Sequence, residues 1–182
     1  MKKLFILIAF LLAVSITPQT YASENIAERS ATLAQETTRD DKDLSQDVRV
    51  AALQNVLKKY DSILVPEAEN FVHYADKHGI DWRLLASISG LESGFGAQYV
   101  HGSYNAYGWG GGYLYFENWE DGINTISLAL RKNYYDHGAD TVAKIGPIYA
   151  ASPYWSSRIS SYIEEIDEEY INLTTLSAAP QF

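Results

Sequence analysis

The segment from Asp81 to Gly96, DWRLLASISGLESGFG, combines a helical pattern with one carboxylate suited to acid chemistry. Leu85, Ile88 and Glu92 recur at i, i+3 and i+7, so they share one face of a predicted helix. Asp81 is its expected N-cap. We expect Glu92 to lie on the apolar face, where loss of hydration keeps a carboxyl protonated to higher pH. Glycoside cleavage needs such a proton donor. The alternative is an ordinary glutamate at a helix end whose carboxyl reaches solvent.

The stretch from Ser93 to Phe116 has the composition of a carbohydrate-binding wall. Its 24 residues include seven glycines, no Asp, Glu, Lys or Arg, and eight aromatic residues: Phe95, Tyr99, Tyr104, Tyr107, Trp109, Tyr113, Tyr115 and Phe116. Glycine lets a backbone approach a ligand closely, and aromatic rings stack on sugar rings. We predict a small irregular β-like excursion that forms one wall of a glycan cleft. The alternative is a hairpin whose rings only pack on the core.

Composition limits the possible functions. The chain has 182 residues, no cysteine and a formal net charge of −9. The absence of cysteine excludes disulfides, thiol nucleophiles and thiolate metal sites. The acidic balance argues against nucleic-acid binding, which needs a basic face. Neither the histidine spacing nor any other motif indicates a metal or cofactor, so we expect none.

The ends of the chain are expected to lie outside the folded domain. Residues 1–22 have the pattern of a secretory signal peptide, with Lys2 and Lys3 before the apolar run Leu4–Val14. That run is shorter than the ~20 residues of a membrane span, so we expect cleavage and an extracytoplasmic protein without stable membrane insertion. An uncleaved N-terminal anchor is the alternative. The composition of residues 23–46 predicts a polar acidic linker, and we expect residues 172–182 to form a flexible tail.

Between these ends, about six helices are predicted. Pro66 suits the first turn of one helix, which Gly79 ends. Asn118 and Asp121 predict the capped start of another. We expect Gly146-Pro147 to break a short helical segment, and Ser152-Pro153 to open the last helix. The fold class is therefore mainly α.

Four short segments carry a family likeness. They are Glu92-Ser93-Gly94, the turn NAYGW at residues 105–109, the helix start FENWEDGI at residues 116–123, and YAASPYW at residues 149–155. In this order they resemble the lysozyme superfamily of peptidoglycan hydrolases, nearest to glucosaminidase-type domains (endo-β-N-acetylglucosaminidases) and related to lytic transglycosylases. The resemblance implies a lysozyme-like domain over residues 47–171, acting on peptidoglycan glycan strands. We expect a monomer.

The resemblance also implies site residues. Glu92 would be the catalytic acid, Tyr149 would be a second catalytic residue at the cleft close to the reaction centre, and Asn105 would border the cleft. The other substrate-binding residues that we expect come from the matched segments and the aromatic stretch: Ser93, Phe95, Tyr107, Trp109 and Tyr154.

A second carboxylate is harder to find. Glycosidases usually pair two acids, but the stretch after Glu92 carries none. Glu117 is the one remaining candidate, because Glu120 and Asp121 are accounted for as partners of a helix dipole. We therefore predict hydrolysis of a β-1,4 bond by a single acid, assisted by the substrate's N-acetyl group.

Three alternatives stay open at this point. A lytic transglycosylase would use the same acid and give a 1,6-anhydro product. A non-catalytic glycan-binding domain would keep the aromatic cleft without cleavage. A structural or partner-binding secreted protein would neither bind nor cleave the glycan.

Overall fold

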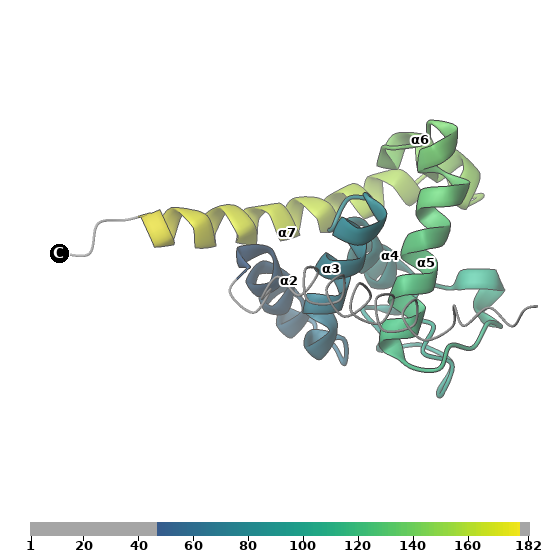
Figure 1. The fold of residues 1–182 in the computed structure, drawn as a ribbon, viewed down its shortest axis with the longest axis horizontal. Coiled ribbons are helices and arrows are strands. Elements are labelled where there is room, and N and C mark those ends of the chain that lie inside the picture. The colour runs from purple at the N-terminus through teal and green to yellow at the C-terminus, as the bar shows by residue number, and fades with distance from the viewer. Residues whose placement is uncertain (1–46, 179–182) are drawn as a thin grey trace, which may run out of the picture. The chain divides into compact units, whose positions relative to one another are not determined.

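The computed structural model describes residues 47–178, which form six α-helices and three short 3₁₀ helices (Figure 1). The α-helices are α2 (Val48–Lys59), α3 (Ala68–His78), α4 (Leu84–Ser93), α5 (Trp119–Asn133), α6 (Val142–Tyr149) and α7 (Trp155–Ala178). The 3₁₀ helices are η2 (Val65–Glu67), η3 (Trp109–Gly112) and η4 (Tyr135–His137). The prediction of a mainly α-helical domain is confirmed. The predicted signal peptide (1–22), the predicted linker (23–46) and residues 179–182 lie outside the described residues.

The expected β-like excursion is wrong, because residues 47–178 contain no strand. The segment between α4 and α5 consists of turns around η3. Gly108, Gly110 and Gly111 have φ angles of +64°, +61° and +71°. A left-handed backbone curls the chain and cannot continue an extended strand.

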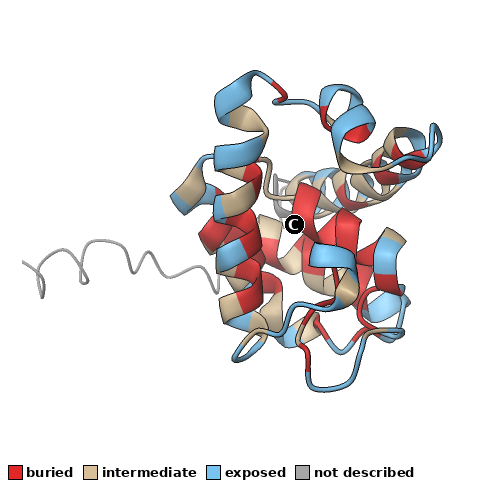
Figure 2. Cartoon of the chain, turned by 90° about the vertical axis from the view of Figure 1, so that its right-hand side faces the viewer, coloured by how far each residue is buried: buried red, intermediate tan, exposed pale blue. Residues whose placement is uncertain are grey.

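Helix α4 is enclosed by the rest of the domain. Its residues Leu84–Gly90 are all buried, and α5 and α7 pack against it. In Figure 2 the buried positions gather on the central helices, whereas the loops are mostly exposed. This differs from the one-sided helix that we predicted, since a helix enclosed on all sides has no polar face. The chain leaves the core only in the last turn of α4, at Leu91 and Glu92.

Most predicted helix ends are confirmed. Pro66 lies in the first turn of η2, which leads into α3, and Gly79 ends α3 in the left-handed conformation with φ +63°. Asn118 caps α5 by accepting from the Asp121 amide at 2.8 Å. Helix α4, however, begins three residues after Asp81, whose carboxylate accepts from the Arg83 amide at 2.9 Å and holds the preceding turn.

Two predicted interruptions are wrong. Helix α6 runs through Gly146 and Pro147 instead of breaking there. One lost amide donor is tolerated in this short helix, and Gly146 allows close packing, since a Cβ there would lie 2.0 Å from Ser156 Oγ. Helix α7 continues to Ala178, although we expected a flexible tail from residue 172. Its first half is fixed by buried side chains such as Ile159 and Ile166, and no Gly or Pro lies between Ile166 and Ala178.

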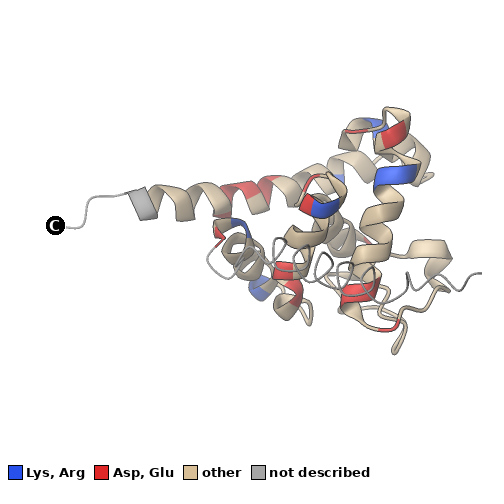
Figure 3. Cartoon of the chain, in the orientation of Figure 1, with Lys and Arg blue, Asp and Glu red and all other residues tan. Residues whose placement is uncertain are grey.

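Polar contacts join α2 and α7, the first and last helices that the structure describes. Asn55 donates to Glu169 at 2.7 Å, and Tyr60 donates to Glu165 at 2.7 Å. The bond to Glu165 raises the pKa of Tyr60 to about 12. In Figure 3 the acidic residues of α7 gather where this helix passes α2. No helix within residues 47–178 has the length and apolar character needed to cross a membrane.

Candidate active site

Glu92 is exposed, so the prediction that apolar neighbours would deprive its carboxyl of water is wrong. Every residue of α4 from Leu84 to Gly90 is buried, but the helix emerges from the core at Leu91 and Glu92. A face that is buried at Ile88 is therefore open to solvent one turn later. Water reaches the carboxyl in the structure as it stands.

Two neighbours nevertheless define the position of this carboxyl. Trp155, at the start of α7, lies with its indole Nε1–H 3.4 Å from Glu92 Oε1. Gly108 lies on the other side, where a Cβ would come 3.0 Å from Glu92 Oε2. No Lys, Arg or His within residues 47–178 forms an ion pair with Glu92.

Aromatic rings from four elements gather beside Glu92. Tyr149, at the end of α6, stacks on Trp155 with 4.7 Å between ring centroids. Trp109 and Tyr134 each lie 6.0 Å from the Tyr149 ring. An open depression of about 400 Å³ is lined by Gly108, Trp109, Gly110, Gly111, Tyr134 and Tyr149. Glu92 stands at its edge, next to Gly108.

Tyr149 presents a hydroxyl that stays protonated. Burial of the ring, and then the negative charge of Glu92, raise the pKa of Tyr149 far above its usual range. Its hydroxyl donates to the backbone oxygen of Tyr107 at 3.2 Å. The neutral hydroxyl has one proton to donate, so it can donate to a ligand in the depression only by leaving the Tyr107 carbonyl, and it cannot act as a base.

Asn105 holds the loop that carries Trp109. Its Oδ1 accepts from the Trp109 amide at 3.1 Å, and its Nδ2 donates to the carbonyls of Trp109 and Leu114 at 2.9 and 3.1 Å. The side chain is buried. Asn105 thus supplies the bonds that a strand partner would otherwise supply, and its polar atoms are occupied by backbone groups.

Three other predicted substrate-binding side chains belong to the interior. Phe95 is fully buried and packs on Tyr60 with 4.6 Å between centroids. Tyr107 is fully buried as well, so its ring does not face the depression, although its carbonyl accepts from Tyr149. Ser93 Oγ lies 2.7 Å from the Ala106 carbonyl and accepts from the Gly96 amide, which fixes the loop to the end of α4.

The two remaining candidates, Tyr154 and Glu117, are exposed. Tyr154 is 71% accessible and is not one of the residues that line the depression. Glu117 is held only through its backbone amide, which donates to Asp121 at 3.1 Å. Of the predicted site residues, the structure therefore brings together Glu92, Tyr149 and Trp109.

The sequence did not single out Trp155, Tyr134 or Gly108 as site residues. Trp155 lies in one of the four matched segments, and Tyr134 lies outside all of them. Gly108 precedes Trp109 in the NAYGW turn, and a glycine beside an aromatic residue was the one available signal of close approach.

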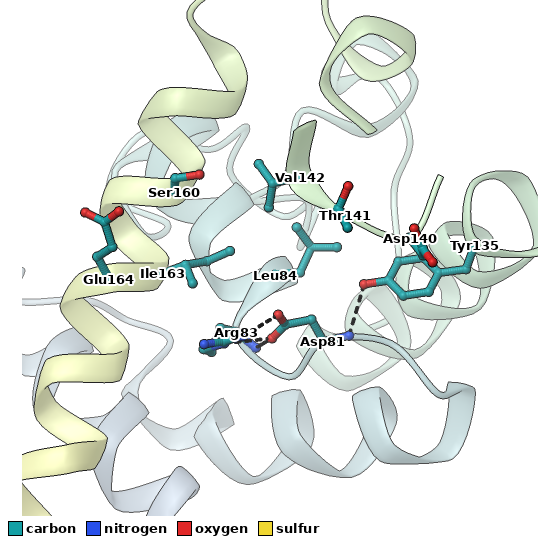
Figure 4. Close-up of a pocket in the computed structure, with 10 residues that line it drawn as sticks. All are labelled: Asp81, Arg83, Leu84, Tyr135, Asp140, Thr141, Val142, Ser160, Ile163 and Glu164. Carbon is teal, nitrogen blue, oxygen red and sulfur yellow. Dashed lines mark hydrogen bonds and ion pairs between the residues drawn. The ribbon is translucent and has the colours of Figure 1, made fainter. Parts of the chain in front are cut away.

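A second depression, of about 280 Å³, lies between the start of α4, the connection from η4 to α6, and α7 (Figure 4). Tyr135 accepts from the Asp81 amide there at 3.1 Å, and Arg83 pairs with Asp81 and Asp167. These polar groups join neighbouring elements, and no predicted site residue lines this depression. Within the described part of the chain, no cluster of three or more His, Asp or Glu is arranged to hold a metal ion.

Comparison of the sequence with protein-family models and with curated proteins finds no match. The lysozyme-superfamily likeness therefore stays a prediction from the four segments.

Proposed function

We propose that this chain is a secreted peptidoglycan hydrolase that cleaves a β-1,4 glycosidic bond of the GlcNAc–MurNAc strand, in the manner of a β-N-acetylglucosaminidase. The observation that carries the proposal is the place of Glu92. Its carboxyl has no cationic partner among the described residues and stands at the edge of a depression lined by Trp109, Tyr134 and Tyr149. A free acid beside a ring-lined groove is suited to cleaving a sugar chain.

The proposed reaction uses Glu92 twice. As an acid it gives its proton to the glycosidic oxygen while the bond from C1 to that oxygen breaks. The N-acetyl oxygen of the substrate bonds to C1 and stabilises the positive charge. The Glu92 carboxylate then takes a proton from water, whose oxygen bonds to C1 and releases the N-acetyl oxygen. Glu92 is an acid again at the end of the cycle.

Tyr149 has a supporting role in this proposal. Its hydroxyl is neutral and lies beside the same depression as Glu92. If its O–H group turns from the Tyr107 carbonyl to the substrate, it can hold the N-acetyl group in the orientation that attack on C1 needs, and orientation alone contributes strongly to rate. Removing the hydroxyl should therefore lower kcat more than it weakens binding.

The exposure of Glu92 is compatible with this chemistry because the bound sugar supplies the cover. A sugar ring of the substrate that stacks on Trp109 and Tyr149 displaces water from the edge of the depression, where Glu92 lies. The carboxyl then meets its substrate in a drier environment than it has in the free protein. A largely neutral glycan needs no charged partner, which agrees with the absence of Asp, Glu, Lys and Arg from residues 93–116.

The test is digestion of purified bacterial cell wall, followed by mass spectrometry of the soluble glycan. We expect new reducing GlcNAc ends from the wild type and none from Glu92→Gln, which keeps the size of the side chain but cannot release a proton. Glu117→Gln is the matched control and should retain activity. Ends that are 1,6-anhydro would identify a lytic transglycosylase instead, and wall binding without new ends would leave a glycan-binding domain. Equal activity of Glu92→Gln and wild type would refute the assignment of the acid.

A further inference from the structure

Trp155 differs from the other rings around the depression. It is only 3% exposed, and its indole N–H points at one charged group, Glu92 Oε1. Glu92 is the acceptor for this N–H among residues 47–178. An indole can only donate, and the carbonyl oxygen of a protonated carboxyl accepts more strongly than its hydroxyl oxygen, so the bond to Trp155 favours the proton on the other oxygen of Glu92.

We propose that Trp155 is a positioning residue that decides which oxygen of Glu92 holds the proton. This inference rests on the proposed function. The indole engages Oε1, so in the acid form the proton sits on Oε2. Oε2 is also the oxygen that lies beside Gly108, and Gly108 lines the depression. The O–H group of Glu92 therefore faces the depression in which the sugar would bind.

The surroundings fix this arrangement from both sides. Tyr149 stacks on Trp155 with an interplanar angle of 27°, which holds the indole plane in place. The absence of a side chain at Gly108 leaves room for Oε2, because a Cβ there would come within 3.0 Å of it. The same indole bond stabilises the carboxylate after the proton has left, when Glu92 must act as a base.

The first experiment needs no enzymatic activity. The chain has four tryptophans, so a ¹H–¹⁵N spectrum shows four indole N–H signals, which Trp→Phe variants assign. We expect the Trp155 signal of the wild-type protein to shift between about pH 3 and pH 8, because its indole bonds to a carboxyl group. In Glu92→Gln that signal should stay in place. The inference would be overturned if the chemical shift of the Trp155 indole did not depend on pH in the wild type. It would also be overturned if that shift changed with pH to the same extent in Glu92→Gln.

The second experiment measures the pH dependence of wall digestion by Trp155→Phe, which keeps an aromatic ring at this position and removes the N–H donor together with part of the indole. We expect kcat to fall about 10-fold at nearly constant KM, as for loss of one hydrogen bond to a charged group. The alkaline limb of the rate profile should move to higher pH, because the carboxylate has lost a stabilising donor. Trp82→Phe, whose ring packs on Tyr170 instead, should leave the profile unchanged.

These outcomes separate the two proposals. A wild-type protein that cuts no glycan refutes the proposed function, whatever the spectra show. An active wild type whose rate profile is the same in Trp155→Phe refutes the role of Trp155 alone. Because a buried ring is replaced, kcat is compared per folded protein, with the folded fraction measured by circular dichroism.

Discussion

The charged residues at the two ends of helix α4 differ in their partners: one is in an ion-pair cluster and the other has no cationic partner among the described residues. At its N-terminal end, Arg83 bonds to Asp81 and to Asp167 of α7, so one cation is shared by two carboxylates. At its C-terminal end, Glu92 has no cationic partner within residues 47–178 and accepts instead from the neutral indole of Trp155. The helix dipole sharpens the contrast, since it favours an acid near the first end and disfavours one near the second.

This difference separates charge that holds the fold from charge that is free to react. The Arg83 cluster joins the turn before α4 to α7, and its bonds raise the pKa of Arg83 further above its usual value. Glu92, in contrast, forms no ion pair that joins two elements within residues 47–178. An unpaired acid costs less at an exposed edge than in the interior, which explains why α4 carries it where the chain leaves the core.

The largest expected effect comes from Glu92→Gln. We expect kcat to fall by about 10²- to 10⁴-fold, the usual contribution of a positioned acid, while the free energy of unfolding is unchanged. Wall digestion and urea denaturation of the same preparation measure the two quantities. A marked loss of stability would contradict the contrast between the two ends, because it would mean that Glu92 is also a structural charge.

Asn105→Ala should give the largest loss of stability near the site. It removes several bonds to the backbone of the loop, and unpaired groups of this kind each cost about 1–3 kcal/mol. We expect a loss of about 2–3 kcal/mol in urea denaturation and earlier proteolysis between residues 105 and 115. The control is Asn172→Ala, at an exposed position of α7, which should be neutral.

Arg83→Met tests the other end of α4. Because the cluster is partly exposed, we expect a loss of only about 1–2 kcal/mol in the free energy of unfolding. The kcat per folded molecule should remain that of the wild type. If kcat fell while the fold stayed intact, the division of α4 into a structural and a reactive end would be wrong.

Gly108→Ala probes the space beside Glu92 Oε2. The residue has φ +64°, so alanine brings backbone strain of about 1 kcal/mol as well as a contact with the carboxylate. Gly138→Ala is the matched control, because φ there is +82° and a Cβ would meet nothing within 4 Å. Equal losses of stability with loss of activity only at Gly108 would support the proposed geometry. Equal activity in both variants would contradict it.

The smallest effect is expected from Tyr107→Phe. The Tyr107 hydroxyl is buried without a partner in the described structure, so its removal should stabilise the protein slightly, by up to about 1 kcal/mol at pH 7. Tyr60→Phe, which loses the bond to Glu165, should be destabilising instead. Urea denaturation distinguishes the two signs, and a loss of stability in Tyr107→Phe would indicate a hydrogen-bond partner outside residues 47–178.

The same tyrosine predicts a loss of stability in alkali. Burial raises the pKa of Tyr107, so the folded protein keeps this proton above about pH 10, where the unfolded chain releases it. This proton leaves the free energy of unfolding independent of pH below about pH 10, and above it the free energy falls by about 1.4 kcal/mol per pH unit for each such group. Tyr107→Phe should make this fall shallower in denaturation curves recorded between about pH 9 and 11.

The sequence by itself determined the helical framework. Pro66, Gly79 and the pair Asn118 and Asp121 mark ends that the structure confirms, because caps and breakers act through neighbouring backbone groups. It also indicated Glu92, Tyr149 and Trp109, which the fold brings to one place.

Only the tertiary structure decided which rings face the depression and how much water reaches the acid. Phe95 and Trp109 are both aromatic residues of one glycine-rich stretch, yet one is fully buried in the core and the other lines the depression. Periodicity gives a direction around a helix axis, but not the point at which that helix leaves the core. The exposure of Glu92 and its contact with Trp155 depend on where α7 and the loop pack, and these are contacts between residues far apart in the chain.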